Sequence, residues 1–450
     1  MPLAGQSPLA PMGAIIAEQS RTAFCVQGAG ARAMGMGGAF IAIADDATAV
    51  TFNPAGLAQM VKPELSWVGQ GINRDVRFQD PQTIGHTKTT VADDSLISNT
   101  RFDPLLLAGT VPLRVNGKTL ALQLSIQRII PLGEGDSRDM AEHPLDGSAP
   151  SALHQSINQT GQIDVYSFAL AYEVSQRILL GISGNLWRGS WRLNSDSSTL
   201  TSGQSTFINY NQYNRLEGAN YNLGLLWRWP TWSLGLSHRT GFHADYSYNA
   251  NLVSSAGRTV SPAVTTGLHW PATDGIGLAV RPAEKWLLAM DLTHTDWSEA
   301  RFMTVNPFLN GQNFFDMSRG HAALNATSFR VGMERLFLTE SGDLVPLRMG
   351  YSREPQPVTD PITGQQRVVQ GLSVGTGFKR AAYTFDLAYR YGWGTRRVSQ
   401  FLDVNQILAG THSTFLGTEN LTEHRLDLSF IVQFEREPVV RLLNYLFVGD

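Results

Sequence analysis

Residues 28–60 read GAGARAMGMGGAFIAIADDATAVTFNPAGLAQM and precede the strand-rich part of the chain. Glycine is concentrated at the start of this stretch, at Gly28, Gly30, Gly35, Gly37 and Gly38. Because glycine allows close backbone contacts and positive φ angles, this density favours a compact, irregular plug over a long helix. Asn53-Pro54 then forces a turn or an extended break before the strands begin.

The same glycines also fit a different kind of site. Gly28-x-Gly30-x-x-Ala33 formally matches the dinucleotide-binding fingerprint. That fingerprint requires a buried strand before it and a helix after it, within a βαβ unit. Residues 17–22 are polar, and the later chain has no alternating helix pattern that could build a parallel sheet. We therefore reject nucleotide binding and expect no cofactor.

The composition excludes further classes of protein. The mean hydropathy is −0.13, and no apolar run approaches the ~18 residues of a membrane-spanning helix. The net charge of −3 and the lack of a basic run argue against a nucleic-acid partner. Cys25 is the single cysteine, so we expect no internal disulfide and no metal site, and we interpret Cys25 as a small buried residue of the plug.

Apolar and polar residues alternate repeatedly from Pro63 onward, which is typical of strands with one apolar face. At 425–434 the even-numbered residues are all apolar, whereas most odd-numbered ones are polar or charged. At 383–393 the odd-numbered residues are apolar or aromatic. A soluble β-sandwich would show the same alternation, so the pattern alone leaves both architectures open.

The connections between the strands distinguish these architectures. Short ones, such as Asn116-Gly117 and 230–231, alternate with long ones, at 79–103, 132–162, 194–214, 253–266, 305–326, 354–369 and 397–423. Outer-membrane barrels combine short periplasmic turns with long outer loops, and aromatic residues mark their interfaces. We predict an all-β fold: a transmembrane, antiparallel, up-and-down β-barrel of about 14 strands at 61–435. A hatch within 1–60 plugs its lumen, and 436–450 form a C-terminal extension with helical apolar spacing.

Several motifs resemble those of the FadL family, the outer-membrane channels for long-chain fatty acids and hydrocarbons. They are Glu18-Gln19-Ser20, Ala44-Asp45-Asp46-Ala47, Asn53-Pro54-Ala55-Gly56-Leu57 and the stretch 276–298. The resemblance implies passive uptake of hydrophobic molecules across the outer membrane of a Gram-negative bacterium. It assigns hatch or gate roles to Gly35, Gly37, Gly38, Asp45, Asp46, Asn53, Pro54 and Ala55. We expect a monomer in contact with membrane lipid, lipopolysaccharide or detergent. Residues 1–14 lack the features of a secretory signal, so we expect the native signal to have been removed or replaced.

The third strand departs from its own alternation. The even-numbered residues from Leu120 to Ile126 are apolar and would face lipid. If the same alternation continued, the charged side chain of Arg128 would lie in hydrocarbon, which is energetically unfavourable. A bulge or kink before Pro131 would avoid that cost. In the FadL family a kink in the third strand opens a lateral hole for the ligand, and the resemblance implies the same role for Arg128 and Pro131.

Charged residues line the predicted inner face of the barrel. Among them are Arg239, Arg330, Arg348, Asp386 and Arg390. Cross-strand pairs could neutralise one another, or an arginine could hold the carboxylate of an acyl ligand. We selected Arg348 and Arg390 for that second role. Apolar positions expected to hold the ligand are Leu226, Leu287 and Ile431 in the lumen, and Phe308, Phe314 and Phe315 in an outer loop.

No catalytic constellation is present: the chain contains neither a G-x-S-x-G elbow nor an H-E-x-x-H motif. We expect a channel without enzymatic activity. The alternative is a FadL-like barrel that acts as a protein-binding shuttle in secretion, like PorV of the type IX secretion system, whose hatch motifs are similar. Such a shuttle needs a protein-sized exposed surface and no lumenal ligand pocket.

Overall fold

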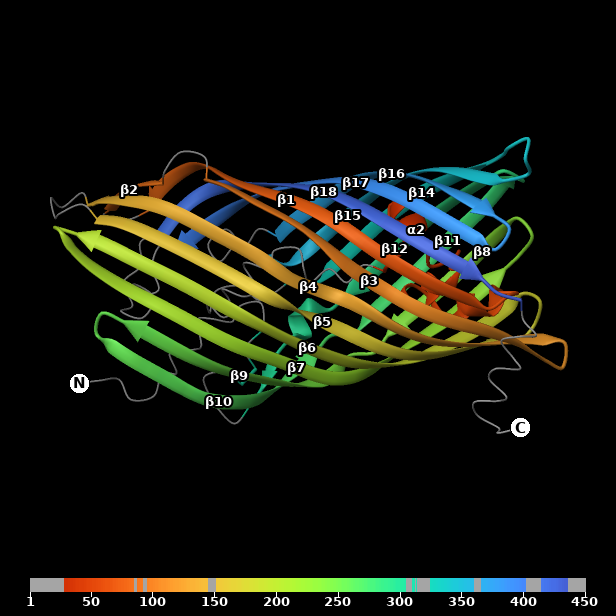
Figure 1. Cartoon of the computed structure of the whole chain (residues 1–450), viewed down its shortest axis with the longest axis horizontal. Coiled ribbons are helices and arrows are strands. Elements are labelled where there is room, and N and C mark those ends of the chain that lie inside the picture. Colours follow the sequence, from red (N-terminus) through yellow and green to blue (C-terminus); the bar gives the residue numbers. More distant parts are fainter. Residues whose placement is uncertain are drawn as a thin grey trace.

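The chain forms a long β-barrel with a short helical segment inside it (Figure 1). The computed structural model describes residues 28–84, 87–91, 95–144, 151–304, 310–311, 313, 324–359, 366–401 and 414–435. Within these ranges, no helix has the length and apolar character needed to cross a membrane. Phe308, Phe314, Phe315, Cys25 and the extension at 436–450 lie outside the described residues.

One antiparallel sheet contains every strand of the described chain. The strands are β1 (Glu64–Ile84), β2 (Thr87–Val91), β3 (Ser95–Val115), β4 (Lys118–Pro144), β5 (Ser151–Glu173), β6 (Ile178–Thr201), β7 (Gln204–Arg228), β8 (Trp232–Arg239), β9 (Phe242–Ser254), β10 (Gly257–Trp270), β11 (Thr273–Ala283), β12 (Trp286–Thr295), β13 (Phe302–Met303), β14 (Ala326–Leu338), β15 (Leu344–Thr359), β16 (Gln366–Arg380), β17 (Tyr383–Phe401) and β18 (Thr414–Gln433). β1 pairs with β18 from Glu64↔Gln433 onward, and this pairing closes the barrel.

The described chain forms fourteen barrel strands, because several of these segments are parts of one strand. β8 and β9 are one strand broken after Arg239, since both pair with β7. β10 with β11, and β12 with β13, form two more broken strands; η3 (Trp297–Glu299) lies within the second break. Among the described residues, β2 pairs with the far end of β4. The predicted strand number and closed antiparallel architecture are confirmed.

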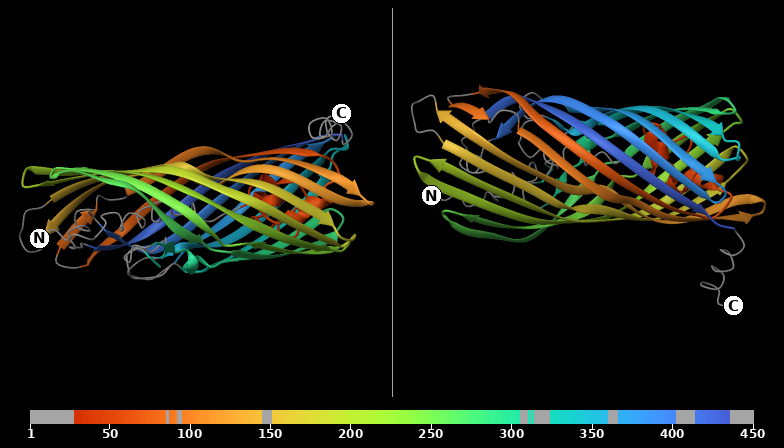
Figure 2. Two further views of the ribbon diagram at one scale, coloured as in Figure 1. Left: turned by 90° about the horizontal axis from the view of Figure 1, so that it is seen from below. Right: turned by 45° about the horizontal axis from the view of Figure 1, so that its top comes forward.

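The length of the outer connections is different from our prediction. Much of 79–103, 132–162, 194–214 and 253–266 is strand rather than loop. β6 and β7 meet at a turn that contains only Ser202 and Gly203, both with positive φ. These hairpins extend the barrel wall well beyond its middle (Figures 1 and 2).

The two faces of the wall follow the predicted alternation. On β18 the side chains of Leu426 and Phe430 are exposed on the outer face, whereas Arg425, Asp427 and Ser429 are buried on the inner face. The inner face of the barrel is therefore charged along β14 to β18, and its outer face is apolar, as a lipid-facing surface requires.

Residues 28–60, which we call the hatch segment, lie inside the barrel, nearer the end with the short turns (Figures 1 and 2). The segment contains α2 (Ala31–Gly35), η1 (Ala47–Thr51) and η2 (Pro54–Gln59), each short and almost fully buried. Asp46 and Asn53 cap η1 and η2 by accepting hydrogen bonds from the backbone amides of Thr48 and Ala55. This compact, irregular form agrees with the glycine-rich sequence.

Glycines of the wall allow the hatch segment to approach the strands closely. Gly37, with φ 68°, packs against the backbone of β15, where a Cβ on Gly350 would collide with the Gly37 nitrogen. On β6, Gly181 packs in the same way against Pro54 and Ala55. The contact is therefore backbone against backbone, which only glycine permits.

Candidate functional site

Asn53 links the hatch segment to the barrel wall. Its Nδ2 donates hydrogen bonds to the carbonyl oxygens of Ile41, at 3.0 Å, and Leu225 of β7, at 3.1 Å. The side chain is fully buried. One amide group therefore satisfies backbone acceptors in the hatch segment and in the wall.

The acidic pair of the hatch segment has two different environments. Asp45 forms an ion pair with Arg32 at 2.5 Å, and Arg32 also forms an ion pair with Glu334 of β14 at 3.0 Å. Asp46 instead caps η1, and burial, followed by the neighbouring Asp45 carboxylate, raises its pKa. Asp45 thus contributes to attachment of the hatch segment, whereas Asp46 shapes its backbone.

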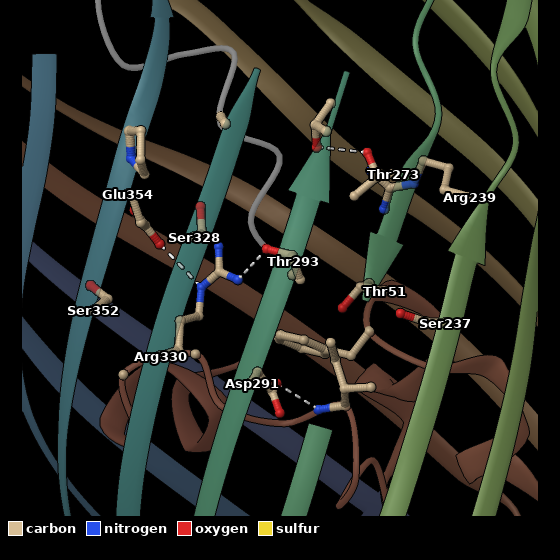
Figure 3. A pocket seen from close by; sticks show the side chains of 18 of the residues that line it. Thr51, Ser237, Arg239, Thr273, Asp291, Thr293, Ser328, Arg330, Ser352 and Glu354 are labelled. Carbon is tan, nitrogen blue, oxygen red and sulfur yellow. Dashed lines mark hydrogen bonds and ion pairs between the residues drawn. The ribbon is translucent and has the colours of Figure 1, made fainter. Parts of the chain in front are cut away.

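A cavity of about 110 Å³ lies in the lumen against the hatch segment, and we call it the central cavity (Figure 3). Gly38, Ile41 and Phe52 of the hatch segment close one side of it. The wall contributes polar groups, in chain order: Asn222, Ser237, His238, Arg239, Thr273, Asp291, Thr293, Thr295, Ser328, Arg330, Ser352, Glu354 and Arg390. Figure 3 shows Arg330 between Glu354 and Thr293, with contacts of 3.2 and 3.0 Å.

Aromatic rings continue from this cavity toward the outer end of the barrel. Trp270 and Trp297 line the cavity, with ring centroids 5.7 Å apart. Trp187 lies 5.5 Å from Trp270 and 5.0 Å from Phe242. All four side chains are buried in one apolar cluster, which also includes Ile130 of β4. We call Trp187, Phe242, Trp270 and Trp297 the aromatic cluster. Its members lie on neighbouring strands and on η3 but far apart in the sequence, so no sequence motif indicated it.

Both arginines selected from the sequence are buried and paired with carboxylates. Arg348 lies 2.7 Å from Glu334 and 2.6 Å from Asp386. Arg390 lies 2.9 Å from Glu423 and 3.4 Å from Glu354. Arg390 lines the central cavity, whereas Arg348 packs beneath the hatch segment against Gly35.

The predicted apolar positions also face inward. Leu226, Leu287 and Ile431 are buried. Leu226 and Leu287 belong to the apolar cluster that holds the hatch segment. None of the three is among the described residues that line the central cavity.

The barrel wall is interrupted between β3 and β4. Their ladder runs from Val115↔Lys118 to Leu106↔Gln127 and stops there. Beyond this point the described residues of β3 pair with β1 and those of β4 pair with β5, but not with each other. Pairing to β4 resumes only at Val91↔Met140, through β2.

A bulge marks the start of this interruption on each strand. The register shifts between Arg128 and Ile130 on β4, which leaves Ile129 unpaired and confirms the predicted bulge before Pro131. A second register shift lies in the pairing of β1 with β3. Val68 and Gly69 are consecutive on β1 but pair with Leu106 and Pro104, so Leu105 of β3 is unpaired. Both unpaired residues line a cavity of about 70 Å³ behind the interruption, which we call the portal cavity.

Side chains, rather than backbone hydrogen bonds, connect β3 to β4 across this interruption. Arg128 lies 3.5 Å from Asp103 of β3 and 3.2 Å from Asp164 of β5. Arg101 of β3 lies 2.8 Å from Asp103 and donates a 3.1 Å hydrogen bond to the carbonyl oxygen of Gly133 on β4. Arg101, Asp103 and Asp164 were not selected from the sequence, and Arg101 and Asp103 fell in a predicted loop.

The portal cavity and the central cavity share part of their lining. Arg390 and Glu354 line both, and they form an ion pair with each other. Ala29 of the hatch segment also lines the portal cavity, together with Arg74 and Glu423. A continuous set of residues thus leads from the lumen to the interrupted wall.

Comparisons with known proteins agree with this architecture. The family described as outer membrane protein transport protein (OMPP1/FadL/TodX) matches residues 13–415. No curated protein sequence matches the chain. A FadL homologue from Pseudomonas aeruginosa aligns with a TM-score of 0.64 at 13% identity, over 90% of this chain and 98% of that one.

Two toluene transporters have the same fold. TodX from P. putida aligns with a TM-score of 0.59 at 14% identity, over 91% of this chain and 99% of that one. TbuX from Ralstonia pickettii aligns with a TM-score of 0.58 at 14% identity, over 92% and 100%. At these identities the structures establish the fold, and the family match establishes the relationship. The chain belongs to the OMPP1/FadL/TodX family of outer-membrane transport proteins.

Proposed function

We propose that this protein is a passive channel that takes up hydrophobic molecules and releases them sideways through the interruption between β3 and β4. The observation that carries this proposal is the paired bulge at Leu105 and Ile129, which opens the ladder in front of the portal cavity. Relatives of the same fold are described as toluene transporters. The family match and the absence of a catalytic motif support a channel rather than an enzyme.

The proposed route has three parts. Ligands move along the aromatic cluster, whose apolar surface suits them, into the central cavity. The hatch segment closes the direct way through the barrel, with Gly35, Gly37, Gly38, Asn53, Pro54 and Ala55 packed against the wall or bonded to it. The ligand then passes Arg390 to reach the portal cavity and the membrane.

The setting follows from the same proposal. In the outer membrane of a Gram-negative bacterium, lipid would lie against the apolar outer face of the barrel. A monomer is sufficient for transport, because the whole route lies within one barrel. Leu226, Leu287, Ile431, Phe308, Phe314 and Phe315 stay candidates for ligand contact. A protein shuttle needs no lumenal cavity, so the central cavity favours transport over that alternative.

Blocking the interruption tests lateral release. Leu105→Trp and Ile129→Trp add bulk at the two bulges, and Leu278→Trp on the outer face of β11 is the matched control. We expect cells that express the first two variants to accumulate labelled toluene more slowly than those with wild type or the control. Heat-modifiable gel migration verifies that each barrel is folded. Wild-type accumulation in both folded bulge variants would contradict lateral release at this site.

A further inference from the structure

Arg239 differs from the other arginines of the lumen. Arg32, Arg74, Arg330, Arg348, Arg390 and Arg425 each lie within salt-bridge distance of a carboxylate. For Arg239 no carboxylate of the described chain lies that close, and its side chain makes no hydrogen bond within that part of the chain. A half-buried guanidinium without a counter-charge is unfavourable until an anion reaches it.

The position of Arg239 points this charge at the central cavity. It ends β8, where it is in register with Asn222 of β7 and Thr273 of β11. Figure 3 shows it beside Thr273, at the opposite side of the cavity from Arg330 and Glu354. Arg239 also lines a narrow space that contains Gln127 and Ile129 of β4, so it lies on the way to the interrupted wall.

Of the two carboxylates that line the cavity in the described chain, Glu354 is paired with arginines, whereas Asp291 is bound through one oxygen and its other oxygen has no hydrogen-bond partner there. Asp291 accepts hydrogen bonds from the amides of Phe40 and Ile41, at 2.7 and 2.9 Å. Glu354 binds Arg330 and Arg390. The neutral polar groups near Arg239 can assist an anion: the Asn222 oxygen is buried without a hydrogen-bond partner in the described chain, so this amide is free to turn its N–H groups toward a ligand.

The size and lining of the cavity describe the rest of the ligand. The central cavity has a volume of about 110 Å³ and is partly open to the lumen; for comparison, a closed apolar cavity of roughly 150 Å³ holds one benzene molecule. Trp270 and Trp297 line this space and offer ring faces and edges. A single aromatic ring therefore fits better than an extended chain.

We propose that Arg239 is a specificity-determining residue that binds the carboxylate of an aromatic acid, whose ring lies against Trp270 and Trp297. A guanidinium suits a carboxylate because it can donate two parallel hydrogen bonds. This inference rests on the proposed function, since it concerns the ligand of the same channel. It distinguishes this chain from relatives described as transporters of toluene, which carries no charge.

Calorimetric titration of the full-length protein in detergent tests the assignment with two probes of similar shape, benzoate and toluene. The variant is Arg239→Gln, and the control is Arg215→Gln, at an exposed pair with Glu217. Because Arg239 has no described ionic partner, its removal leaves no buried carboxylate unpaired. We expect Arg239→Gln to weaken benzoate binding by about 10- to 100-fold, the range for a hydrogen bond to a charged group, and to leave toluene binding within about 2-fold.

The remaining arms separate this inference from the proposed function. Arg239→Lys keeps the charge and should recover part of the benzoate affinity, whereas the control should match wild type for both probes. Equal benzoate affinity in wild type and Arg239→Gln would overturn the role of Arg239 while leaving toluene uptake intact. Failure of wild-type cells to accumulate toluene would instead overturn the channel itself.

Discussion

Arg128 of β4 reaches Asp103 of β3 across the interruption in the barrel wall, with Nη1 3.5 Å from Oδ1. The backbones at this height are not paired, so the ion pair and the contact from Arg101 to Gly133 hold the two strands together. The wall is therefore weakest where the proposed route leaves the lumen. Charged side chains can separate and pair again without breaking a ladder of backbone bonds.

Asp103→Asn should loosen this connection. The substitution removes the negative charge between Arg101 and Arg128, and it should cost about 1–3 kcal/mol of unfolding free energy. We expect faster accumulation of labelled toluene together with a lower urea midpoint for barrel unfolding in detergent. Glu217→Gln, at an exposed pair on the outer face of β7, should change neither measurement. Slower accumulation in Asp103→Asn would mean that the ion pair shapes the route rather than restrains it.

Gly350→Ala should displace the hatch segment. The added Cβ would meet the backbone of Met36 and Gly37, and overpacking of this kind costs about 1–3 kcal/mol. Single-channel conductance in planar bilayers should rise, because small ions pass a displaced hatch segment. Gly109→Ala is the matched control on β3, since its Cβ would meet nothing within 4 Å. Closed barrels in both variants would contradict the assignment of the hatch segment as the plug.

Trp270→Leu should weaken the affinity for aromatic ligands. Trp270 contacts Trp187, Phe242 and Trp297 and lines the central cavity. Ring contacts contribute roughly 0.5–1.5 kcal/mol beyond buried area, so toluene binding measured by calorimetry should fall accordingly. Trp286→Leu, where Arg335 covers the ring near the short turns, serves as the control. If both variants bind toluene like wild type, the aromatic cluster is only a structural core.

The wall of the barrel could be predicted because its signal is local. Alternation along β17 and β18 follows from the two environments of each strand, so sequence neighbours suffice to identify the faces. The bulge near Arg128 could be predicted for the same reason, since one charged residue contradicted the phase of its own strand. The long outer hairpins could not be predicted in this way. Outside the membrane neither face of a strand needs to be apolar, so the alternation of apolar and polar residues becomes weak there.

The candidate site depends on residues far apart in the chain. Whether an inward arginine is paired depends on the opposite strand: Arg348 meets Asp386, whereas Arg239 meets Thr273. Likewise the aromatic cluster joins residues of β6, β9, β10 and η3 that share no motif. The sequence therefore identified the class of side chain in the lumen, and only the register between strands distinguished one arginine from another.

The pairing of β1 with β18 has a consequence for how the molecule is made. Glu64 bonds to Gln433 across 369 positions of the chain, and the amide of Ala31 in the hatch segment bonds to Ser429 on the same last strand. This seam joins the first and last strands of the barrel, so it requires nearly the whole chain, and such distant contacts are slow to form. The hatch segment, which immediately precedes β1, is too closely fitted to the wall to enter a finished cylinder. We therefore expect the barrel to assemble around the hatch segment, with the pairing of β1 and β18 formed last.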